Sequence, residues 1–293
     1  MTSAESDLAP LTVVMIALNE AHNLPGVLEN LDGFASEILL IDSYSADATI
    51  DIALRGGIKV VQRRFGGFGD QWNFAVNGLA ASQPWTMKLD PDERLTDELK
   101  ESIRAALARG AADGFLLPRR LHFMGAPLPI RQDILRIWRT GTCRFEDVLV
   151  NEHPIVAGQH ELLRGDLEHH DSPTLHHWYD KQNAYTTAEA IGAWRDDSLS
   201  ARPRFFGTSI ERRMWMKALT RRVPFVPTLF FFYYLIGRGA WRAGRNGVIW
   251  ALLRRDVYRM IAYKRRELHR LGAAYEIPAP RTAAPDLRVP QYD

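Results

Sequence analysis

The chain has 293 residues, of which 46% are hydrophobic and 25% charged, with a net charge of +2. These values allow one or two globular domains and exclude collagen, wholesale disorder and a polytopic membrane protein, while the single cysteine, Cys143, excludes a disulfide framework and a thiolate zinc site built within the chain. The charge is uneven: residues 202–270 hold 17 Lys or Arg and 3 Asp or Glu, a net +14, whereas the rest carries −12.

The first hundred residues alternate between short β-branched runs and segments with apolar residues at helical spacing. This alternation predicts a parallel sheet between helices, and the ligands of such sheets gather beyond the C-terminal ends of the strands. No basic region or long apolar core precedes the first run, so no signal peptide is expected. The predicted strands are 11–17, 37–42, 58–62 and 85–90, and the predicted helices are 22–33, 46–55 and 71–82.

The regular alternation is lost after a predicted helix at 96–109. Residues 114–170 are typical of strands joined by Pro- and Gly-rich connections, and a helical pattern returns at 173–197. The predicted fold class is therefore α/β, with a mixed but mostly parallel sheet between helices.

The basic segment also contains strongly apolar stretches. Phe225–Ile236 is an apolar run of twelve residues, whereas a helix needs about 20 to span the hydrocarbon core of a bilayer. In 247–268, an apolar helical side that includes Trp250, Leu253 and Val257 lies beside a strongly basic one, which is typical of a helix in a membrane interface. We therefore expect C-terminal amphipathic helices on an anionic membrane surface. A nucleic acid is the alternative partner for this charge, but the interleaved aromatic residues favour lipid.

An acidic motif, K-L-D-P-D-E at 88–93, spans the end of the fourth predicted strand. Asp90 and Asp92 would lie where that strand ends, and paired carboxylates suit Mg²⁺ or Mn²⁺, which completes its shell with substrate phosphates. The alternative is an acidic turn that caps the next helix.

Polar side chains also follow the first two predicted strands. Asn19 and Glu20 come after the first strand, and Asp42 ends the second. A helix-capping role would explain each of them singly. Three of the four predicted strands end in oxygen-bearing side chains, and at one edge of a sheet these favour a shared binding site.

The order of the motifs resembles that of a known enzyme family. A-L-N-E, I-D-S-x-S-x-D-x-T, G-F-G-D-Q-W-N-F-A and L-D-P-D-E-R-L are similar to the nucleotide-sugar domain of family 2 glycosyltransferases, which have the GT-A fold. V-N-E, a histidine in G-D-L-E-H-H-D-S-P and the basic aromatic segment extend the resemblance to the lipopolysaccharide-core β-1,4-glucosyltransferase subgroup, over residues 11–270. The chain departs from that subgroup in D-P-D-E, where D-A-D-E is frequent, and in Trp241–Gly244, where an Asp-Gly pair is common.

The resemblance implies a role for each matching residue. Glu152 would be the general base opposite the anomeric carbon, although Glu146 and Asp147 are rival bases. Two histidine pairs, 169–170 and 176–177, also make a site of imidazoles conceivable. The donor-binding residues would be Ala17, Asn19, Glu20, Asp42, Gln71, Asn73 and Asp90, and the metal ligands would be Asp90, Asp92 and His169.

The implied reaction is an inverting transfer of a hexose, glucose in the subgroup, from a UDP-sugar to a lipid-linked or lipopolysaccharide-core glycan, with Mg²⁺ or Mn²⁺ on the diphosphate. An acceptor hydroxyl must lose a proton while a diphosphate leaves, so two separate acidic sites are needed, and the sequence has two. A polyprenyl phosphate acceptor and a non-enzymatic protein that binds anionic polymers remain open. A sugar-1-phosphate nucleotidyltransferase is disfavoured, because acidic A-L-N-E stands where a basic, glycine-rich loop would be needed.

The predicted organisation has three parts. A GT-A catalytic domain covers 1–200, with a nucleotide-sugar half at about 11–110 and an acceptor half at about 111–200. A basic amphipathic helical region, 201–272, and a Pro- and Ala-rich tail, 273–293, follow it. The expected location is the cytoplasmic face of the inner membrane, peripheral or monotopic, with no nucleic acid as a partner.

Overall fold

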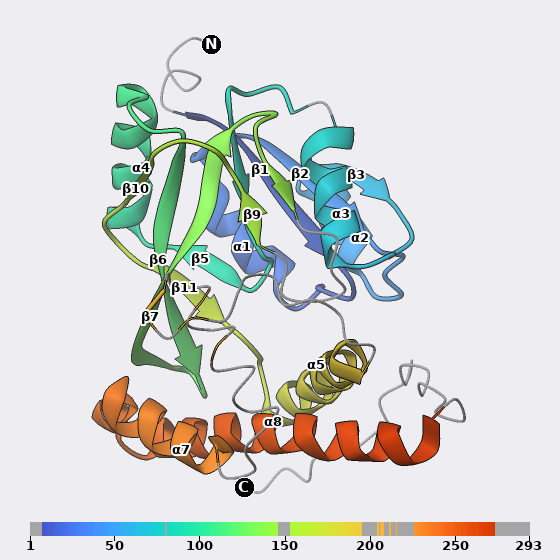
Figure 1. Ribbon diagram of the computed structural model, residues 1–293. Coiled ribbons are helices and arrows are strands. Elements are labelled where there is room, and N and C mark those ends of the chain that lie inside the picture. The colour runs from blue at the N-terminus through green and yellow to red at the C-terminus, as the bar shows by residue number, and fades with distance from the viewer. Residues whose placement is uncertain are drawn as a thin grey trace, which may run out of the picture.

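The computed structural model has one large sheet with helices on both of its faces (Figure 1). It describes residues 8–79, 81–145, 153–194, 204, 206–207, 211, 215 and 226–272. The large sheet has the strand order β3-β2-β1-β4-β7-β6-β11-β5, with β10 paired to β6, and β8 and β9 form a separate pair. The strands are β1 (Ala9–Ala17), β2 (Ala35–Asp42), β3 (Lys59–Gln62), β4 (Trp85–Lys88), β5 (Glu93–Leu95), β6 (Gly114–Phe123), β7 (Ala126–Arg139), β8 (Arg144–Phe145), β9 (Pro154–Ile155), β10 (His160–Leu162) and β11 (Leu167–His170).

The four strands expected in the first hundred residues all form, and they pair in parallel. Within these pairs Ala17 lies opposite Asp42, and Val14 lies opposite Lys88. The three central strands β1, β2 and β4 therefore end at one edge of the sheet. The α/β class with a mixed, mostly parallel sheet is confirmed.

The two faces of the sheet carry separate cores because the side chains of β1 alternate. Leu11, Val13 and Met15 pack with α1 (Leu24–Leu31), α2 (Thr49–Arg55) and α4 (Asp97–Arg109) on one face. Val14 packs on the other face with α3 (Phe68–Asn73) and the π-helical turn η2 (Phe74–Gly78) that continues it. Both faces are thus covered, as the predicted alternation of strands and helices requires.

The second half of the sheet is mixed. β7 is antiparallel to β4 and to β6, β11 is parallel to β6, and β5 is antiparallel to β11. In the last of these pairs, His169 of β11 lies opposite Glu93 of β5. The chain segment around the acidic motif is therefore joined directly to a strand that lies more than seventy residues further along.

The apolar side of the last long helix packs against the protein itself. The last described elements are the helices α5 (Leu175–Trp194), α7 (Val226–Phe232), η3 (Tyr233–Gly237), η4 (Ala240–Ala243) and α8 (Gly244–Leu271). Trp250, Leu253 and Val257 of α8 are buried in one cluster with Phe123, Leu128 and Ile130 of the β6–β7 hairpin and Trp178 of α5. The expectation that this face of α8 enters a membrane interface is corrected accordingly: an amphipathic pattern does not distinguish a lipid surface from a protein core.

Several strongly exposed apolar side chains lie on the elements that precede α8. Leu229, Phe232, Ile236 and Trp241 are each more than half exposed. None of the helices in the described part of the chain is both long and apolar enough to span a bilayer. The predicted domain boundary near residue 200 falls within 195–203, outside the described residues, as does the predicted tail at 273–293.

Candidate active site

The loops that follow β1 and β2 are joined to each other by hydrogen bonds at the ends of these strands. Ser43 donates its backbone N–H to the carbonyl of Ala17 at 2.8 Å, while the side chain of Ala17 packs into the core. Asn19, in the left-handed region at φ 57°, accepts the N–H of Ala46 at 2.8 Å. Asp42 is fully buried and accepts the N–H of Ser45 at 3.0 Å. Asn19 and Asp42 therefore lie in one hydrogen-bonded loop pair. Neither is a helix cap, because α1 begins after Asn23 and α2 after Ala48, both without a side-chain cap.

Glu20 links this loop pair to the acidic motif. Its carboxylate accepts a hydrogen bond from Asn23 Nδ2 at 2.8 Å. Burial raises the pKa of Glu20 to about 7, and the negative charge of Asp92 adds to this effect, while Asn23 and Lys181 oppose it. The charge of Asp92 therefore acts on Glu20, and the two carboxylates share one electrostatic environment.

A pH dependence of stability follows from the raised pKa of Glu20. The folded state binds this proton more tightly than the unfolded state, so the free energy of unfolding should fall as the pH rises from about 4.5 to about 7. With EDTA present, Glu20→Gln should be more stable than the wild type by about 1–3 kcal/mol at pH 8, and close to it at pH 4.5. Urea unfolding at both pH values measures this. An equal difference at both values, or the same gain from the exposed control Glu29→Gln, would contradict the explanation.

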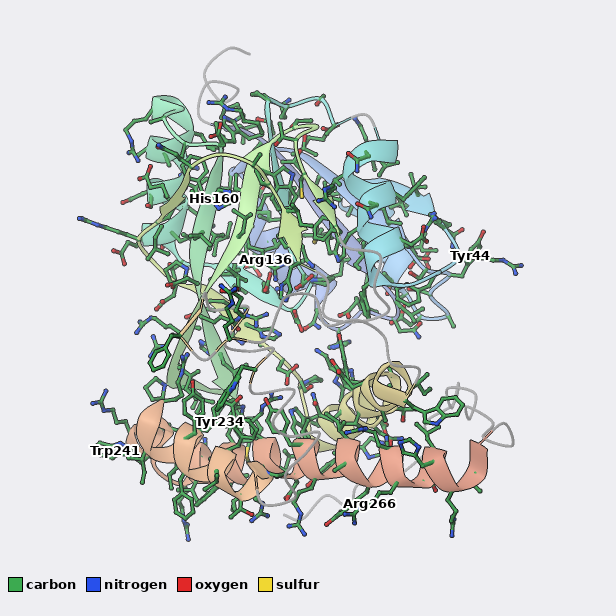
Figure 2. The ribbon with its side chains drawn as sticks, in the orientation of Figure 1. Tyr44, Arg136, His160, Tyr234, Trp241 and Arg266 are labelled. Atoms are coloured by element: carbon green, nitrogen blue, oxygen red, sulfur yellow. The ribbon has the colours of Figure 1, made fainter. Side chains whose placement is uncertain are left out.

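The first carboxylate of the acidic motif is engaged by a buried arginine (Figure 2). Arg136 of β7 donates to Asp90 Oδ2 at 2.7 Å and to Glu93 Oε1 at 2.6 Å. Burial disfavours the charged form of Asp90, but the positive charges of Arg136 and Lys88 outweigh burial and lower the pKa of Asp90. Glu93 is fully buried, which raises its pKa. Arg136 therefore fixes the loop that carries Asp92.

The second carboxylate belongs to a compact cluster with side chains from β11 and α5. His169 Nε2 lies 3.2 Å from Asp92 Oδ2 and 4.0 Å from Asp171 Oδ1. Lys181 Nζ lies 3.2 Å from Asp92 Oδ2 and 2.9 Å from Asp171 Oδ1. The backbone N–H of His170 donates to the carbonyl of Asp92 at 2.8 Å, which holds β11 against the acidic motif. We call Asp92, His169 and Asp171 the DHD cluster.

The DHD cluster fits a divalent cation. Its three candidate ligand atoms lie within 4.8 Å of one another. Burial disfavours both carboxylates as anions, but His169 and Lys181 lower the pKa of Asp92, and the same two groups lower that of Asp171, so both are ionised. Burial alone would lower the pKa of Lys181, but the two carboxylates raise it, so the lysine stays cationic. Two carboxylate oxygens and one imidazole nitrogen suit Mn²⁺ or Mg²⁺.

The structure brings together two of the three predicted metal ligands, Asp92 and His169. Asp90 faces Arg136 and is not a member of the DHD cluster. Asp171 and Lys181 were not predicted as ligands or neighbours of a metal. Asp171 stands two residues after His169 in H-H-D-S-P, and this proximity was the only signal for it.

The remaining predicted residues divide between the site and its surroundings. Gln71 is buried and its Nε2 donates to Ser43 Oγ at 3.3 Å, so it reaches the loop after β2. Asn73 instead exchanges two hydrogen bonds with the backbone of Phe145 in β8. Glu152, the predicted base, lies outside the described residues, as do its rivals at 146 and 147.

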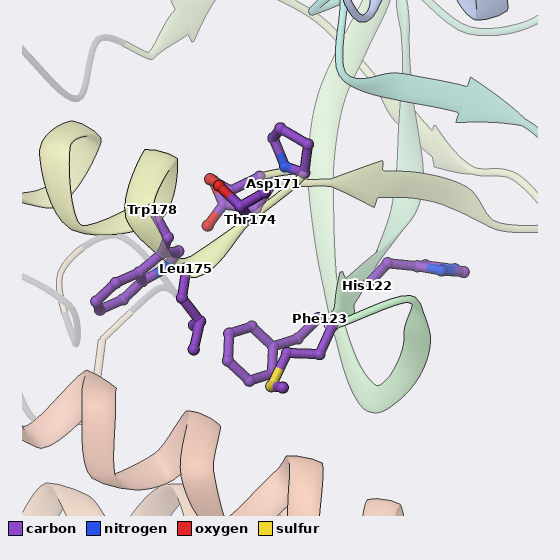
Figure 3. A pocket seen from close by; sticks show the side chains of 9 residues that line it. His122, Phe123, Asp171, Thr174, Leu175 and Trp178 are labelled. Carbon is purple, nitrogen blue, oxygen red and sulfur yellow. The ribbon is translucent and has the colours of Figure 1, made fainter. Parts of the chain in front are cut away.

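A pocket of about 200 Å³ lies beside the DHD cluster, with Asp171 in its wall (Figure 3). Phe123, Leu175 and Trp178 give it an apolar, aromatic lining, and Thr174 adds a hydroxyl. His122 also contributes to the lining, but Figure 3 shows its imidazole directed away from the other labelled side chains.

A family model and several known proteins are similar to this chain. The model of glycosyl transferase family 2 matches residues 12–164, more than half of the chain. LpsC of Rhizobium meliloti (strain 1021), a lipopolysaccharide core biosynthesis glycosyltransferase, is 29% identical over 259 residues, which cover 83% of this chain and 87% of LpsC. An uncharacterized glycosyltransferase of Rickettsia typhi is 23% identical over 199 residues, covering 61% of this chain and 66% of that protein.

Solved structures are similar at low identity. TarS of S. aureus aligns with a TM-score of 0.43 and 17% identity, over 85% of this chain and 55% of TarS. Glucosyl-3-phosphoglycerate synthase of Mycobacterium tuberculosis, in complex with Mn²⁺, UDP and glucosyl-3-phosphoglycerate, aligns with a TM-score of 0.31 and 23% identity, over 41% of this chain and 46% of that chain.

Proposed function

The protein belongs to glycosyl transferase family 2, and from this premise we propose that it transfers a hexose from a UDP-sugar to a lipopolysaccharide-core or other lipid-linked saccharide. The observation that supports the proposal most is the convergence of two carboxylates and an imidazole at one edge of the sheet. Glu20 follows β1, Asp92 follows β4 and His169 lies in β11. His169 Nε2 nevertheless lies 3.2 Å from Asp92 Oδ2, and the charge of Asp92 acts on Glu20. The likeness to LpsC over most of both chains supports a lipopolysaccharide-core acceptor, and the subgroup resemblance supports glucose as the sugar.

In the proposed reaction, an oxygen of the acceptor forms a bond to the anomeric carbon while the bond from that carbon to the diphosphate breaks. The hydroxyl proton passes to the carboxylate of Glu152, and the anomeric configuration is inverted. Asn19, Asp42 at the end of β2 and Gln71 of α3 would hold the nucleotide. Asp92, His169 and Asp171 would hold Mn²⁺ or Mg²⁺, which supplies positive charge to the leaving diphosphate when bound. Lys181 adds a second positive charge at the same place.

A transfer assay tests this function. Purified protein with Mn²⁺ should transfer sugar from a UDP-hexose to a lipopolysaccharide-core glycolipid, and EDTA should abolish the transfer. Glu152→Gln should lower kcat by about 10²–10⁴-fold, because a general base contributes a factor of this size, while the KM for the donor stays close to the wild-type value. Transfer to polyprenyl phosphate alone would overturn the proposed acceptor. Unchanged transfer by Glu152→Gln would overturn the role of this residue.

We also propose that the protein acts at the cytoplasmic face of the inner membrane as a peripheral or monotopic protein. The exposed apolar residues Leu229, Phe232, Ile236 and Trp241 would enter the interface. Arg238, Arg242 and Arg245 accompany them in the sequence, and each basic residue near an anionic surface contributes about 1 kcal/mol. Trp241 lies at one end of the layer formed by α7 and α8 (Figure 2).

Vesicle binding is the measurement for this proposal. Replacing Ile236 and Trp241 together by serine should weaken binding to anionic vesicles by at least about 10-fold, since burying one large apolar side chain contributes about 1.5–3 kcal/mol. Leu54→Ser, which changes a 59% exposed side chain of α2, is the matched control and should leave binding unchanged. Equal binding by the double variant and the wild type would contradict membrane attachment through this surface.

A further inference from the structure

The strand β11 presents ligand-type side chains on both of its faces. His169 belongs to the DHD cluster, whereas Glu168 and His170, which flank it in the strand, point to the opposite face. On that face His170 lies opposite His122 of the parallel neighbour β6, and the two imidazole rings have centroids 4.3 Å apart. Ligand atoms of His122, Glu168 and His170 all lie within 4.8 Å of one another. We call these three residues the HEH cluster.

The distances within the HEH cluster suit a shared ion better than direct hydrogen bonds. His122 Nε2 lies 3.4 Å from Glu168 Oε1, and His170 Nε2 lies 3.5 Å from Glu168 Oε2. Both separations exceed the 2.7–3.2 Å that is usual for hydrogen bonds. They match the spacing of neighbouring ligand atoms around tetrahedral Zn²⁺, which is about 3.4 Å for metal–ligand distances of about 2.1 Å.

One ligand atom of the HEH cluster also lacks a hydrogen-bond partner. His122 Nε2 is buried and makes no hydrogen bond. A buried polar atom without a hydrogen bond is costly, and a bound ion would remove that cost. The side chain of His170 is 42% exposed, so the cluster can be reached from solvent.

We propose that His122, Glu168 and His170 form a second cation site, separate from the DHD cluster, that binds Zn²⁺ or a similar transition-metal ion with a fourth position open to solvent. Two imidazoles and one carboxylate are a nitrogen-rich set that prefers Zn²⁺ or Co²⁺, whereas the oxygen-rich DHD cluster suits Mn²⁺ or Mg²⁺. An ion at this site would tie β6 to β11, the strand that carries His169.

The test uses Co²⁺, whose visible absorption reports tetrahedral coordination, on the full chain after treatment with EDTA. Asp92→Asn removes a ligand of the DHD cluster, so this variant should still bind one Co²⁺ per chain with tetrahedral bands, and Zn²⁺ should displace it. Added to Asp92→Asn, His170→Ala and Glu168→Gln should each weaken this binding by at least about 100-fold, since even groups that only hydrogen-bond to a ligand change metal affinity by about 10–100-fold. His269→Ala, at an exposed histidine near the end of α8, is the matched control and should bind as the wild type does.

Zn²⁺ should also raise the melting temperature of the wild type and of Asp92→Asn, but not that of the double variant Asp92→Asn/His170→Ala. Absence of tetrahedral Co²⁺ bands in Asp92→Asn would overturn the proposal, and so would an unchanged Co²⁺ affinity when His170→Ala is added to Asp92→Asn. If the variants of the HEH cluster do not fold, the result for Asp92→Asn decides alone.

Discussion

Asp92→Asn should lower kcat/KM for sugar transfer by about 10²–10³-fold, the loss seen when one group that stabilises transition-state charge is removed. Asparagine keeps the shape of the side chain but not its charge. The DHD cluster would lose a buried, ionised carboxylate that contacts both His169 and Lys181. Initial rates of UDP release and sugar transfer at several Mn²⁺ concentrations measure the effect.

The control for this variant is Asp180→Asn, an exposed carboxylate on α5 that is not part of the DHD cluster. It should transfer sugar at the wild-type rate. The melting temperature of Asp92→Asn should be recorded alongside, so that a loss of folded protein is not mistaken for a loss of catalysis. A wild-type kcat/KM in Asp92→Asn at saturating Mn²⁺ would show that the DHD cluster does not serve the reaction.

Arg136→Met should lower the free energy of unfolding by about 3–5 kcal/mol, because it leaves two carboxylates without their buried partner. Arg136 and Glu93 are both almost fully buried, and Arg136 also pairs with Asp90. Methionine fills a similar volume, so the loss would come from charge and not from a cavity. Urea unfolding at pH 7 gives the value.

Arg109→Met is the matched control. Arg109 forms an ion pair of the same length, 2.6 Å, with Glu161, but both side chains are at least 40% exposed. Such pairs contribute at most about 1 kcal/mol, so the control should change stability little. Similar losses in the two variants would mean that burial of the Arg136 pairs is not what stabilises them.

The sequence predicts the parallel half of the fold well because that half is built from local signals. β-branched runs mark β1 to β4, and the polar residues that follow them point to the correct edge of the sheet. At α4, Thr96 accepts the N–H of Leu99 at the start and Gly110 adopts φ 58° at the end, so both limits are visible in the sequence. Helix caps and strand patterns act within a few residues, and no tertiary context is needed to interpret them.

The parts that could not be predicted depend on partners far away in the sequence. Asp171 and Lys181 join Asp92 only because β11 pairs with β5 and α5 follows directly. Arg136 stands in the apolar stretch I-L-R-I-W-R, where a strand pattern gives no indication that its guanidinium faces two acids. The apolar side of α8 fits a membrane and a protein core equally well, and only its packing against the β6–β7 hairpin and α5 distinguishes them.

Part of the candidate active site lies in and just before helix α5, beyond the end of the family match. The family match ends at residue 164, yet Asp171 and Lys181 lie beyond it, so a fragment trimmed to that limit would lack part of the DHD cluster and its lysine. A fragment that ended after α5 would lack α8, which covers Trp178 and Ile191, so these two side chains would be exposed to water. The hydrogen bond that Lys264 of α8 donates to the carbonyl of Asn183, at 2.7 Å, would also be lost. We therefore expect the smallest fragment that folds on its own to extend through α8.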